Sequence, residues 1–277
     1  MPGNLRATFS SGQSGKGKRP SQAATSLSAA SSLLNAEKLR ALYAAMVKCR
    51  MLQEKLGTSA RRRERAAHFE LGAEAVLAGT VCDLLSGDCI APSPRSSLAR
   101  MVKGTAVAEI FSAHAKARQE PQSGPLQLGI GAGLALALKR QKQSNVALCM
   151  LDEDLLANDG WKEAVAFAAE RKLPLVCVVE TRSIAKDLRA AADGCGAPAI
   201  TVDGSDVVAV YRVMQEATRR ARQGHGPTLI QGKLLGADPL DFMENYLRKR
   251  DLWSDAWREK LIADFRTELQ RAGRARK

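Results

Sequence analysis

The segment Asn145–Ser183, NVALCMLDEDLLANDGWKEAVAFAAERKLPLVCVVETRS, decides the fold class of this chain. Two apolar runs, 146–151 and 174–180, are separated by the acidic triplet 152–154 and an amphipathic stretch at 159–171. Apolar runs of this length that alternate with helical stretches predict right-handed βαβ crossovers in a parallel sheet covered on both faces. The triplet would directly follow a buried strand, which is where α/β proteins bind their ligands.

The same alternation continues towards the C-terminus. Apolar runs at 199–202 and 228–233 predict two more strands, and residues 206–223 between them have the spacing of an amphipathic helix. Asp203 and Asp206 fit a turn followed by a helix cap. We therefore predict an α/β fold with a doubly wound parallel sheet.

Helices are also predicted before the first of these strands. Asn35 can cap an amphipathic helix that Gly57 ends, and a second helix is expected at 72–85. A turn at Gly87 and Asp88 should follow the second helix.

Two further helical regions are expected. In the first, at 131–141, the glycines of GIGAG (129–133) favour close packing of a helix on the sheet. A phosphate loop is disfavoured there because no clear strand precedes it and no acid follows about 20 residues later. From about residue 239 the chain should be helical, with Trp253 and Trp257 on one face of a terminal helical hairpin.

Composition narrows the function classes. The net charge of +13 suggests nucleic acid as a partner, but only 4% of residues are aromatic and no nucleic-acid motif is present, so specific nucleic-acid binding is not expected. No apolar run approaches the ~18 residues of a membrane span, and no secretory signal begins the chain. The six cysteines lack zinc-ligand spacing, which predicts buried thiols in a reducing compartment, the cytoplasm.

The composition also divides the chain into three regions. Residues 1–34 are rich in Ser, Ala and Gly and contain no acid, which predicts a disordered basic tail. This composition also fits an organellar targeting segment, although a flexible bacterial tail fits it better. Residues 35–237 should form the α/β domain, and residues 238–277 the C-terminal helices with a basic tail.

The acidic triplet allows two interpretations. Adjacent carboxylates at the carboxyl end of a parallel strand can bind a hard cation such as Mg²⁺. The same residues can instead form a solvated turn, with Asn158 or Asp159 starting the next helix. Their spacing alone does not decide between the two.

Several motifs occur in the order typical of one known family. LYAAMVKCRMLQEKL (42–56) resembles its first helix, HFELGAEA (68–75) its H-x-x-x-G-Q-E-A motif, and DCIAPSPRSSLARMVKG (88–104) its D-x-x-x-x-x-[YH]-R turn. EAVAFAAERKLPLVCVVE, VDGSDVVAVYRVMQEATRRARQGHGPTLI and DPLDFMENYLRKRDLWSDAW follow in family order. The chain thus resembles the α subunit of the thiamine-diphosphate-dependent 2-oxo acid dehydrogenases, the E1 component of pyruvate and branched-chain complexes.

This resemblance implies a thiamine-diphosphate-binding fold and an oxidative decarboxylation that passes an acyl group to a lipoyl arm. The implied cofactors are thiamine diphosphate and Mg²⁺, and the implied partner is a β-type E1 subunit, in an α2β2 heterotetramer; a homodimer is the other assembly expected. By position, His68 corresponds to the active-site histidine, while Arg95 and Gly124 correspond to cofactor-binding residues.

The chain departs from the family at the metal site. The family's G-[DE]-G triplet falls on 152–154, so the resemblance keeps Glu153 as the metal ligand but puts acids, among them Asp154, where glycines approach the cofactor's diphosphate. The later Asn of that motif is Ala157. The second Asn of the family's E-N-N falls on Arg182, also a cofactor-binding position, and a guanidinium has no acceptor for a metal.

Two family segments are also reduced. FSAHAKARQEPQSGP (111–125) stands in place of a glycine-rich segment that ends in His, and TLIQGKLLGA (228–237) continues without the family's phosphorylatable loop. We therefore predict a degenerate E1α-like protein, inactive alone, with a structural or regulatory role. One alternative is an active thiamine-diphosphate-dependent E1α, which His68, Arg95 and Glu153 would support; the other is a non-enzymatic basic binding module.

The replacement of a metal ligand by arginine leads to a specific hypothesis. The family positions of Glu153 and Arg182 lie at the carboxyl ends of neighbouring strands. We expect the guanidinium of Arg182 to lie near Glu153, Asp152 or Asp154 and to replace Mg²⁺ as an internal counter-ion. Such an ion pair would close the site to the cofactor.

Overall fold

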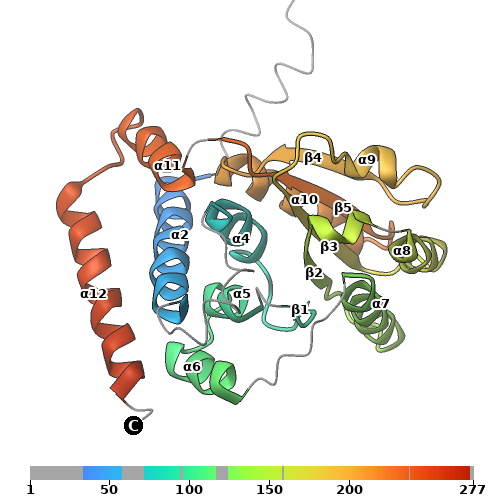
Figure 1. Cartoon of the computed structure of the whole chain (residues 1–277), viewed down its shortest axis with the longest axis horizontal. Helices are drawn as coiled ribbons and strands as arrows, with labels where there is room; N and C mark the ends of the chain where they lie inside the picture. Colours follow the sequence, from blue (N-terminus) through green and yellow to red (C-terminus); the bar gives the residue numbers. More distant parts are fainter. Residues whose placement is uncertain are drawn as a thin grey trace, which may run out of the picture. The chain divides into compact units, whose positions relative to one another are not determined.

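The computed structural model describes residues 34–57, 72–93, 96–116, 124–157, 159–236 and 238–274. The chain divides into two units, Met1–Asn35 and Ala36–Lys277, and every described helix and strand belongs to the second (Figure 1). Some predicted features lie outside the described residues: the N-terminal tail up to residue 33, His68, Pro94 and Arg95.

Within the described residues, five parallel strands form one sheet in the order β1-β2-β3-β5-β4. The strands are β1 (Cys89–Ile90), β2 (Ala147–Asp152), β3 (Leu175–Thr181), β4 (Ala199–Asp203) and β5 (Thr228–Lys233). The four predicted strands are confirmed to within one residue at each end. The two-residue strand β1 was not predicted, since it is too short for a hydrophobic period to reveal it.

Helices connect these strands and cover the sheet. They are α2 (Ala36–Gly57), α4 (Glu74–Val81), α5 (Ser96–Val102), α6 (Val107–Lys116), α7 (Gly124–Arg140), α8 (Gly160–Glu170), α9 (Leu188–Ala191), α10 (Val207–Arg222), α11 (Pro239–Arg248) and α12 (Asp255–Arg274). A 3-10 turn, η2 (Glu153–Ala157), follows β2. None of the described helices is long and apolar enough to cross a membrane.

The predicted helices are present, with corrected ends. Asp206 caps α10 as expected, since its carboxylate accepts from the N–H groups of Val208 and Ala209. The predicted helix at 72–85 already ends at Val81, because the N–H of Leu85 is taken by the carboxylate of Asp88 at 2.7 Å. The helix predicted at 131–141 begins seven residues earlier, at Gly124.

The prediction for the two tryptophans is wrong in one respect, because Trp253 precedes α12 instead of lying on it. The hydroxyl of Ser254 accepts from the N–H of Trp257 at 3.3 Å, so the helix begins only after this serine. Both indole rings still contact Tyr43 of α2, with ring centroids 5.2 and 5.5 Å away. The C-terminal helices are thereby tied to α2, which Figure 1 shows between α12 and α4.

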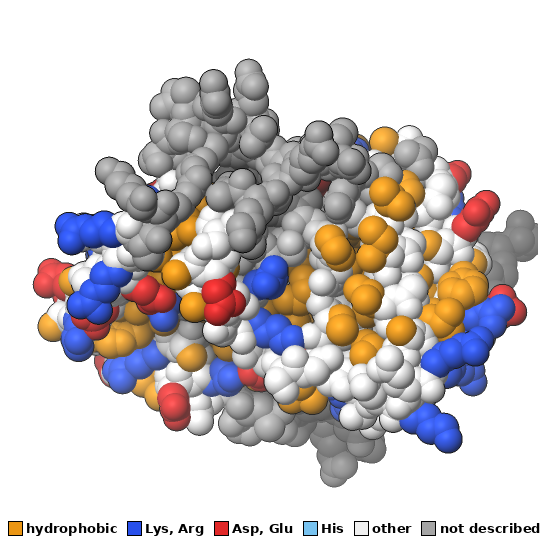
Figure 2. Space-filling model, turned by 90° about the horizontal axis from the view of Figure 1, so that it is seen from below, with side chains coloured by type: hydrophobic (Ala, Val, Ile, Leu, Met, Phe, Trp, Pro, Cys, Tyr) orange, Lys and Arg blue, Asp and Glu red, His pale blue; other side chains and the backbone are white. Residues whose placement is uncertain are grey.

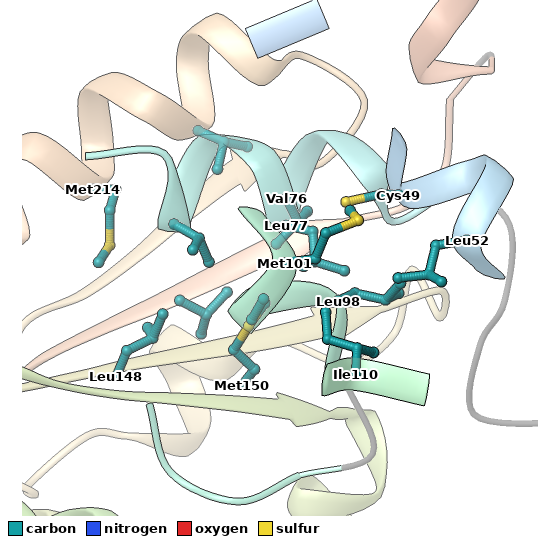
Figure 3. Close-up of a cluster of buried hydrophobic side chains, with 14 of the residues drawn as sticks. Cys49, Leu52, Val76, Leu77, Leu98, Met101, Ile110, Leu148, Met150 and Met214 are labelled. Atoms are coloured by element: carbon teal, nitrogen blue, oxygen red, sulfur yellow. The ribbon is translucent and has the colours of Figure 1, made fainter. Parts of the chain in front are cut away.

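Each face of the sheet has its own hydrophobic core, because successive strand residues point to opposite faces. On one face, Leu148 and Met150 pack with Val76 of α4, Leu98 of α5 and Met214 of α10, as Figure 3 shows. The other face has a second core, which includes residues of the same strands and of α7 and α8: Ala147, Cys149, Cys177, Leu128, Trp161 and Val165. Both clusters are buried, which confirms a sheet covered on both sides.

The close packing predicted for GIGAG is confirmed at Gly131. A Cβ on this residue would lie 2.0 Å from Sγ of Cys149, so only glycine lets α7 approach β2 this closely. Gly129 and Gly133 face open space instead. The helix therefore packs through one of its glycines, and the segment is helical throughout rather than a loop.

Candidate functional site at the carboxyl edge of the sheet

The acidic triplet lies at the carboxyl edge of the sheet, where two neighbouring parallel strands end. Asp152 at the end of β2 pairs in register with Glu180 of β3, so the segments that follow these residues lie side by side. Glu153 begins η2, and Arg182 follows β3 directly. The parallel register thus brings together two of the residues that the resemblance assigns to the metal site.

The carboxylate of Glu153 is engaged by its own chain. Its Oε2 accepts from the backbone N–H groups of Arg182 at 2.9 Å and Ser183 at 3.0 Å. The ammonium of Lys186 lies 3.7 Å from Oε1 and donates to the backbone carbonyl of Glu153 at 3.1 Å. The N–H of Ser183, that of Arg182 and the charge of Lys186 together hold the pKa of Glu153 below its usual range.

The hypothesis of an arginine counter-ion is therefore wrong in the residue that it names. Lys186 supplies the cation beside Glu153, and Arg182 contributes its backbone N–H. No ion pair within the described residues joins the guanidinium of Arg182 to the three acids. This side chain lies towards Gly72, where an added Cβ would be 4.0 Å from Nη2 of Arg182. The backbone of Arg182 faces Glu153, so its side chain extends to the other side.

The other two acids behave as a solvated turn. Asp154 is exposed, and its N–H donates to the carboxylate of Asp152 at 3.3 Å. Asp159 precedes α8 but makes no capping bond through its side chain, and instead pairs with Lys162 at 2.9 Å. The two interpretations of the triplet thus apply to different residues: the carboxylate of Glu153 is held by its own chain, Asp152 is half-buried at the end of β2, and Asp154 faces water.

A buried glutamine holds the loop that carries Lys186. Gln231, in the middle of β5, is fully buried and uses both ends of its amide. Its Nε2 donates to the carbonyl of Lys186 at 2.7 Å and to the hydroxyl of Thr181 at 3.0 Å. Its Oε1 accepts from the N–H of Leu188 at 3.2 Å and the hydroxyl of Thr201 at 3.1 Å. Three strands and the loop after β3 are therefore joined through one side chain.

Gly124 also lies in this neighbourhood. A Cβ on this residue, the first of α7, would lie 3.0 Å from Cδ1 of Leu155 in η2. The structure thus brings together Gly124, Glu153, Asp154 and Arg182 at one edge of the sheet, whereas His68 and Arg95 lie outside the described residues.

A metal site needs several oxygen or nitrogen ligands that converge. In the part of the chain that the structure describes, no group of three or more His, Cys, Asp or Glu side chains is placed to hold a metal ion. Within the described residues, Glu153 instead forms an ion pair with Lys186, whose ammonium lies 3.7 Å from its Oε1.

Sequence reasoning missed both Lys186 and Gln231. Lys186 is one of many cations in a basic chain, and nothing in its spacing indicates that it folds back onto Glu153. Gln231 could have been found, because it is a polar residue in the interior of a strand, directly after Leu229 and Ile230. Burying an amide there costs free energy unless it is fully hydrogen-bonded, which indicates a specific role.

Known proteins similar to this chain point to one family. Residues 43–277 match the profile of the family described as "Dehydrogenase E1 component". The pyruvate dehydrogenase E1 component subunit alpha of Mycoplasma genitalium is 28% identical over 288 positions, which cover 86% of this chain and 80% of that protein. The 3-methyl-2-oxobutanoate dehydrogenase subunit alpha of Mycobacterium tuberculosis is 28% identical over 287 positions, covering 85% and 78%.

A more distant match comes from a solved structure. The X-ray structure of "a putative thiamin diphosphate-dependent enzyme isolated from Mycobacterium smegmatis" is 20% identical, and the match covers 41% of this chain and 22% of that chain. The TM-score of this match is 0.34.

The alignment with the Mycoplasma protein also contains gaps on the side of this chain. Its 288 positions exceed the 277 residues of the whole chain, so some positions of the relative have no counterpart here. The matched profile, in contrast, covers most of the chain, from the middle of α2 to the last residue. On this match, the chain belongs to the dehydrogenase E1 component family, and the two relatives named above are alpha subunits of dehydrogenases.

Proposed function

We propose that this chain is an E1α-like subunit that no longer binds thiamine diphosphate and Mg²⁺, and that it serves as a structural or regulatory partner of a β-type E1 subunit. The observation that carries the proposal is that the carboxylate of Glu153 already has partners within its own chain. Its carboxylate already has two backbone N–H donors and a lysine ammonium from its own chain.

A magnesium ion does not fit this arrangement. Mg²⁺ requires octahedral coordination by oxygen atoms at about 2.0–2.1 Å. At Glu153, one carboxylate oxygen is saturated by N–H donors, and the other faces the ammonium of Lys186, which would repel a second cation. Arg182, at the position of the second family ligand, offers a guanidinium without a lone pair. The lysine therefore occupies the electrostatic role of the metal.

The diphosphate of the cofactor does not fit either. Asp152 and Asp154 stand where the family has glycines, and two carboxylates would repel a diphosphate that lacks its metal. By the resemblance, the chain is also shortened at 111–125 and after 228–237, where the family has a glycine-rich segment and a phosphorylatable loop. Both kinds of change act against cofactor binding.

The proposed partner fits an apolar face of α7. Apart from Gln127, which is buried, residues 124–138 of this helix carry no polar side chain. Leu126 and Ala137 are exposed and Ile130 is partly exposed along the outer face. Figure 2, seen from the side on which α7 lies in Figure 1, shows hydrophobic side chains gathered over this region. A helix that is apolar all round is normally covered, so we infer that another subunit packs on this face.

The substrate class of such an assembly is set by its catalytic partners, so we propose no particular 2-oxo acid. Two alpha subunits with equal identity to this chain carry different substrates in their names, pyruvate in one and 3-methyl-2-oxobutanoate in the other. A working E1α is the competing proposal. It is favoured by the retained Glu153, which stands at the position of the family's metal ligand.

Reconstitution with a β-type E1 subunit from the same organism tests the proposal. Sedimentation velocity should show a complex of the two chains. The complex should not reduce an electron-accepting dye when pyruvate or a branched-chain 2-oxo acid is added with thiamine diphosphate and Mg²⁺. Turnover above that of the β-type subunit alone would establish the competing proposal, and the absence of any complex would refute the role as a partner.

A further inference from the structure

A cavity of about 420 Å³ lies between α2, α11 and α12, and none of its lining residues belongs to the site at the carboxyl edge. Its apolar walls are formed by Val47 and Met51 of α2, Leu240 of α11, and Ile262 and Leu269 of α12. Its volume falls within the range of about 300–1,000 Å³ that is usual for sites of small organic ligands.

The polar lining of the cavity is dominated by cations. Arg50, Lys55, Arg258 and Arg266 line it, against a single acid, Glu54. The acids that pair with two of these arginines lie outside the lining. The cavity therefore offers hydrogen-bond donors next to an apolar surface.

Arg50 is fixed in place from outside the cavity. Its Nε donates to Glu74 at 2.8 Å, and its Nη1 donates to Asp238 at 2.5 Å. Its Nη2 is buried and has no acceptor in the described part of the chain. Because two carboxylates already neutralise Arg50, it contributes a hydrogen-bond donor rather than net charge.

Arg258 and Arg266 supply further hydrogen-bond donors to the cavity. Nε of Arg258 donates to Glu244 at 3.1 Å and to the hydroxyl of Tyr43 at 3.2 Å, which leaves its two terminal nitrogens without an acceptor among the described residues. Arg266 is exposed and makes no ion pair within the described ranges. A guanidinium held at Nε presents its other two nitrogens as a rigid fork, which suits a carboxylate or another oxyanion.

From this arrangement we propose that the cavity is a binding site for a small organic anion with an apolar body. The anionic head lies at Arg258 and Arg266, and the apolar body lies between Leu240, Ile262 and Val47. The chain's own N-terminal segment is an unsuitable occupant, because residues 1–33 contain Lys and Arg but no acid. The proposal is independent of whether the chain binds thiamine diphosphate.

The test uses the full chain and the fluorescent probe 8-anilinonaphthalene-1-sulfonate, which has an aromatic body and a sulfonate head. Octanoate should displace a saturable part of the bound probe, and octanol should displace it at least about tenfold more weakly, because a charge-assisted hydrogen bond is worth about 1.5–3 kcal/mol. Equal displacement by the two would overturn the proposal of an anion site.

Variants test whether the probe that octanoate displaces is bound in this cavity. Arg266→Gln should weaken octanoate binding about twofold to fivefold, within the range of exposed charge pairs. Ile262→Trp should remove the octanoate-sensitive signal by filling the cavity. Arg271→Gln, on an exposed position of α12 outside the lining, is the matched control and should change nothing. Unchanged octanoate binding in both test variants, with folding verified by circular dichroism, would refute the site.

Discussion

At the scale of one residue, Glu153 stands at the position that the resemblance gives to a metal ligand, but its carboxylate is already engaged by its own chain. Two backbone N–H groups and the ammonium of Lys186 surround the acid. The side chains of Glu153 and Lys186 are 31% and 34% exposed, so water screens the pair and its net contribution is at most about 1 kcal/mol. The arrangement adds little to the stability of the fold, but it neutralises a negative charge that would otherwise attract a divalent cation.

Glu153→Gln should lower the free energy of unfolding by about 1 kcal/mol at pH 7. The pKa of Glu153 is lowered in the folded chain, so its stabilisation is full above the ordinary glutamate pKa of about 4.3 and is lost as the pH falls through the folded pKa. The difference between variant and parent should therefore shrink below about pH 4. Urea unfolding at several pH values measures this dependence.

Asp154→Asn provides the control for that experiment. Asp154 is the exposed neighbour of Glu153, and its change should stay within about 0.5 kcal/mol at every pH. A constant difference between Glu153→Gln and the parent from neutral to acid pH would show that the effect is not one of charge.

At the scale of secondary-structure elements, the sequence predicts what hydrophobic periodicity encodes. The runs that became β2, β3, β4 and β5 are apolar because each strand is buried on both faces, so their positions could be read directly. The positions of the short helices α5 and α6 could not be predicted, because tertiary packing rather than a long amphipathic pattern stabilises these helices. The prediction of Arg182 as the counter-ion was wrong, because the direction of a side chain after a strand depends on the conformation of the loop. Gln231 holds that loop through the carbonyl of Lys186.

Replacing Gln231 by leucine tests that role. Gln231→Leu leaves the N–H of Leu188 and the carbonyl of Lys186 without their partner, and it should destabilise the chain by about 2–4 kcal/mol. Hydrogen exchange at the amide of Leu188 should speed up more than exchange within β3. Gln143→Leu, in an exposed turn, is the control. Unchanged exchange at Leu188 would mean that the loop is held by other contacts.

Gly131 and Gly133 form a matched pair on α7. Gly131→Ala places a methyl group against the buried Sγ of Cys149 and should cost about 1–3 kcal/mol through overpacking. Gly133→Ala meets open space, so the better helix propensity of alanine should leave stability unchanged or raise it by up to about 1 kcal/mol. Thermal unfolding of both variants measures the difference, and equal stabilities would contradict the close approach of α7 to β2.

At the scale of the whole molecule, the proposed role as a partner of a β-type subunit requires a surface on which that subunit can pack. The apolar outer face of α7 is the surface that would be covered by another subunit, since exposed apolar patches of this kind mark interaction sites. Leu126, which is 56% exposed, is its most exposed large side chain.

Leu126→Lys should therefore weaken the complex with a β-type subunit by at least about tenfold, because it places a charge in an apolar interface. Leu85→Lys is the control, since Leu85 is 50% exposed in the turn after α4 and lies outside this face. Sedimentation velocity compares both variants with the parent chain. If Leu85→Lys weakens the complex and Leu126→Lys does not, the interface lies elsewhere.

The most direct test of the central claim is calorimetric titration of thiamine diphosphate, in the presence of Mg²⁺, into the complex of this chain with its β-type subunit. The same β-type subunit with an alpha subunit that retains the family's metal ligands serves as the positive control. Because Lys186 already neutralises Glu153, we predict no saturable, Mg²⁺-dependent heat for the complex that contains this chain. Binding of about one cofactor per chain with a Kd in the micromolar range, equivalent to about −8 kcal/mol, would contradict the account.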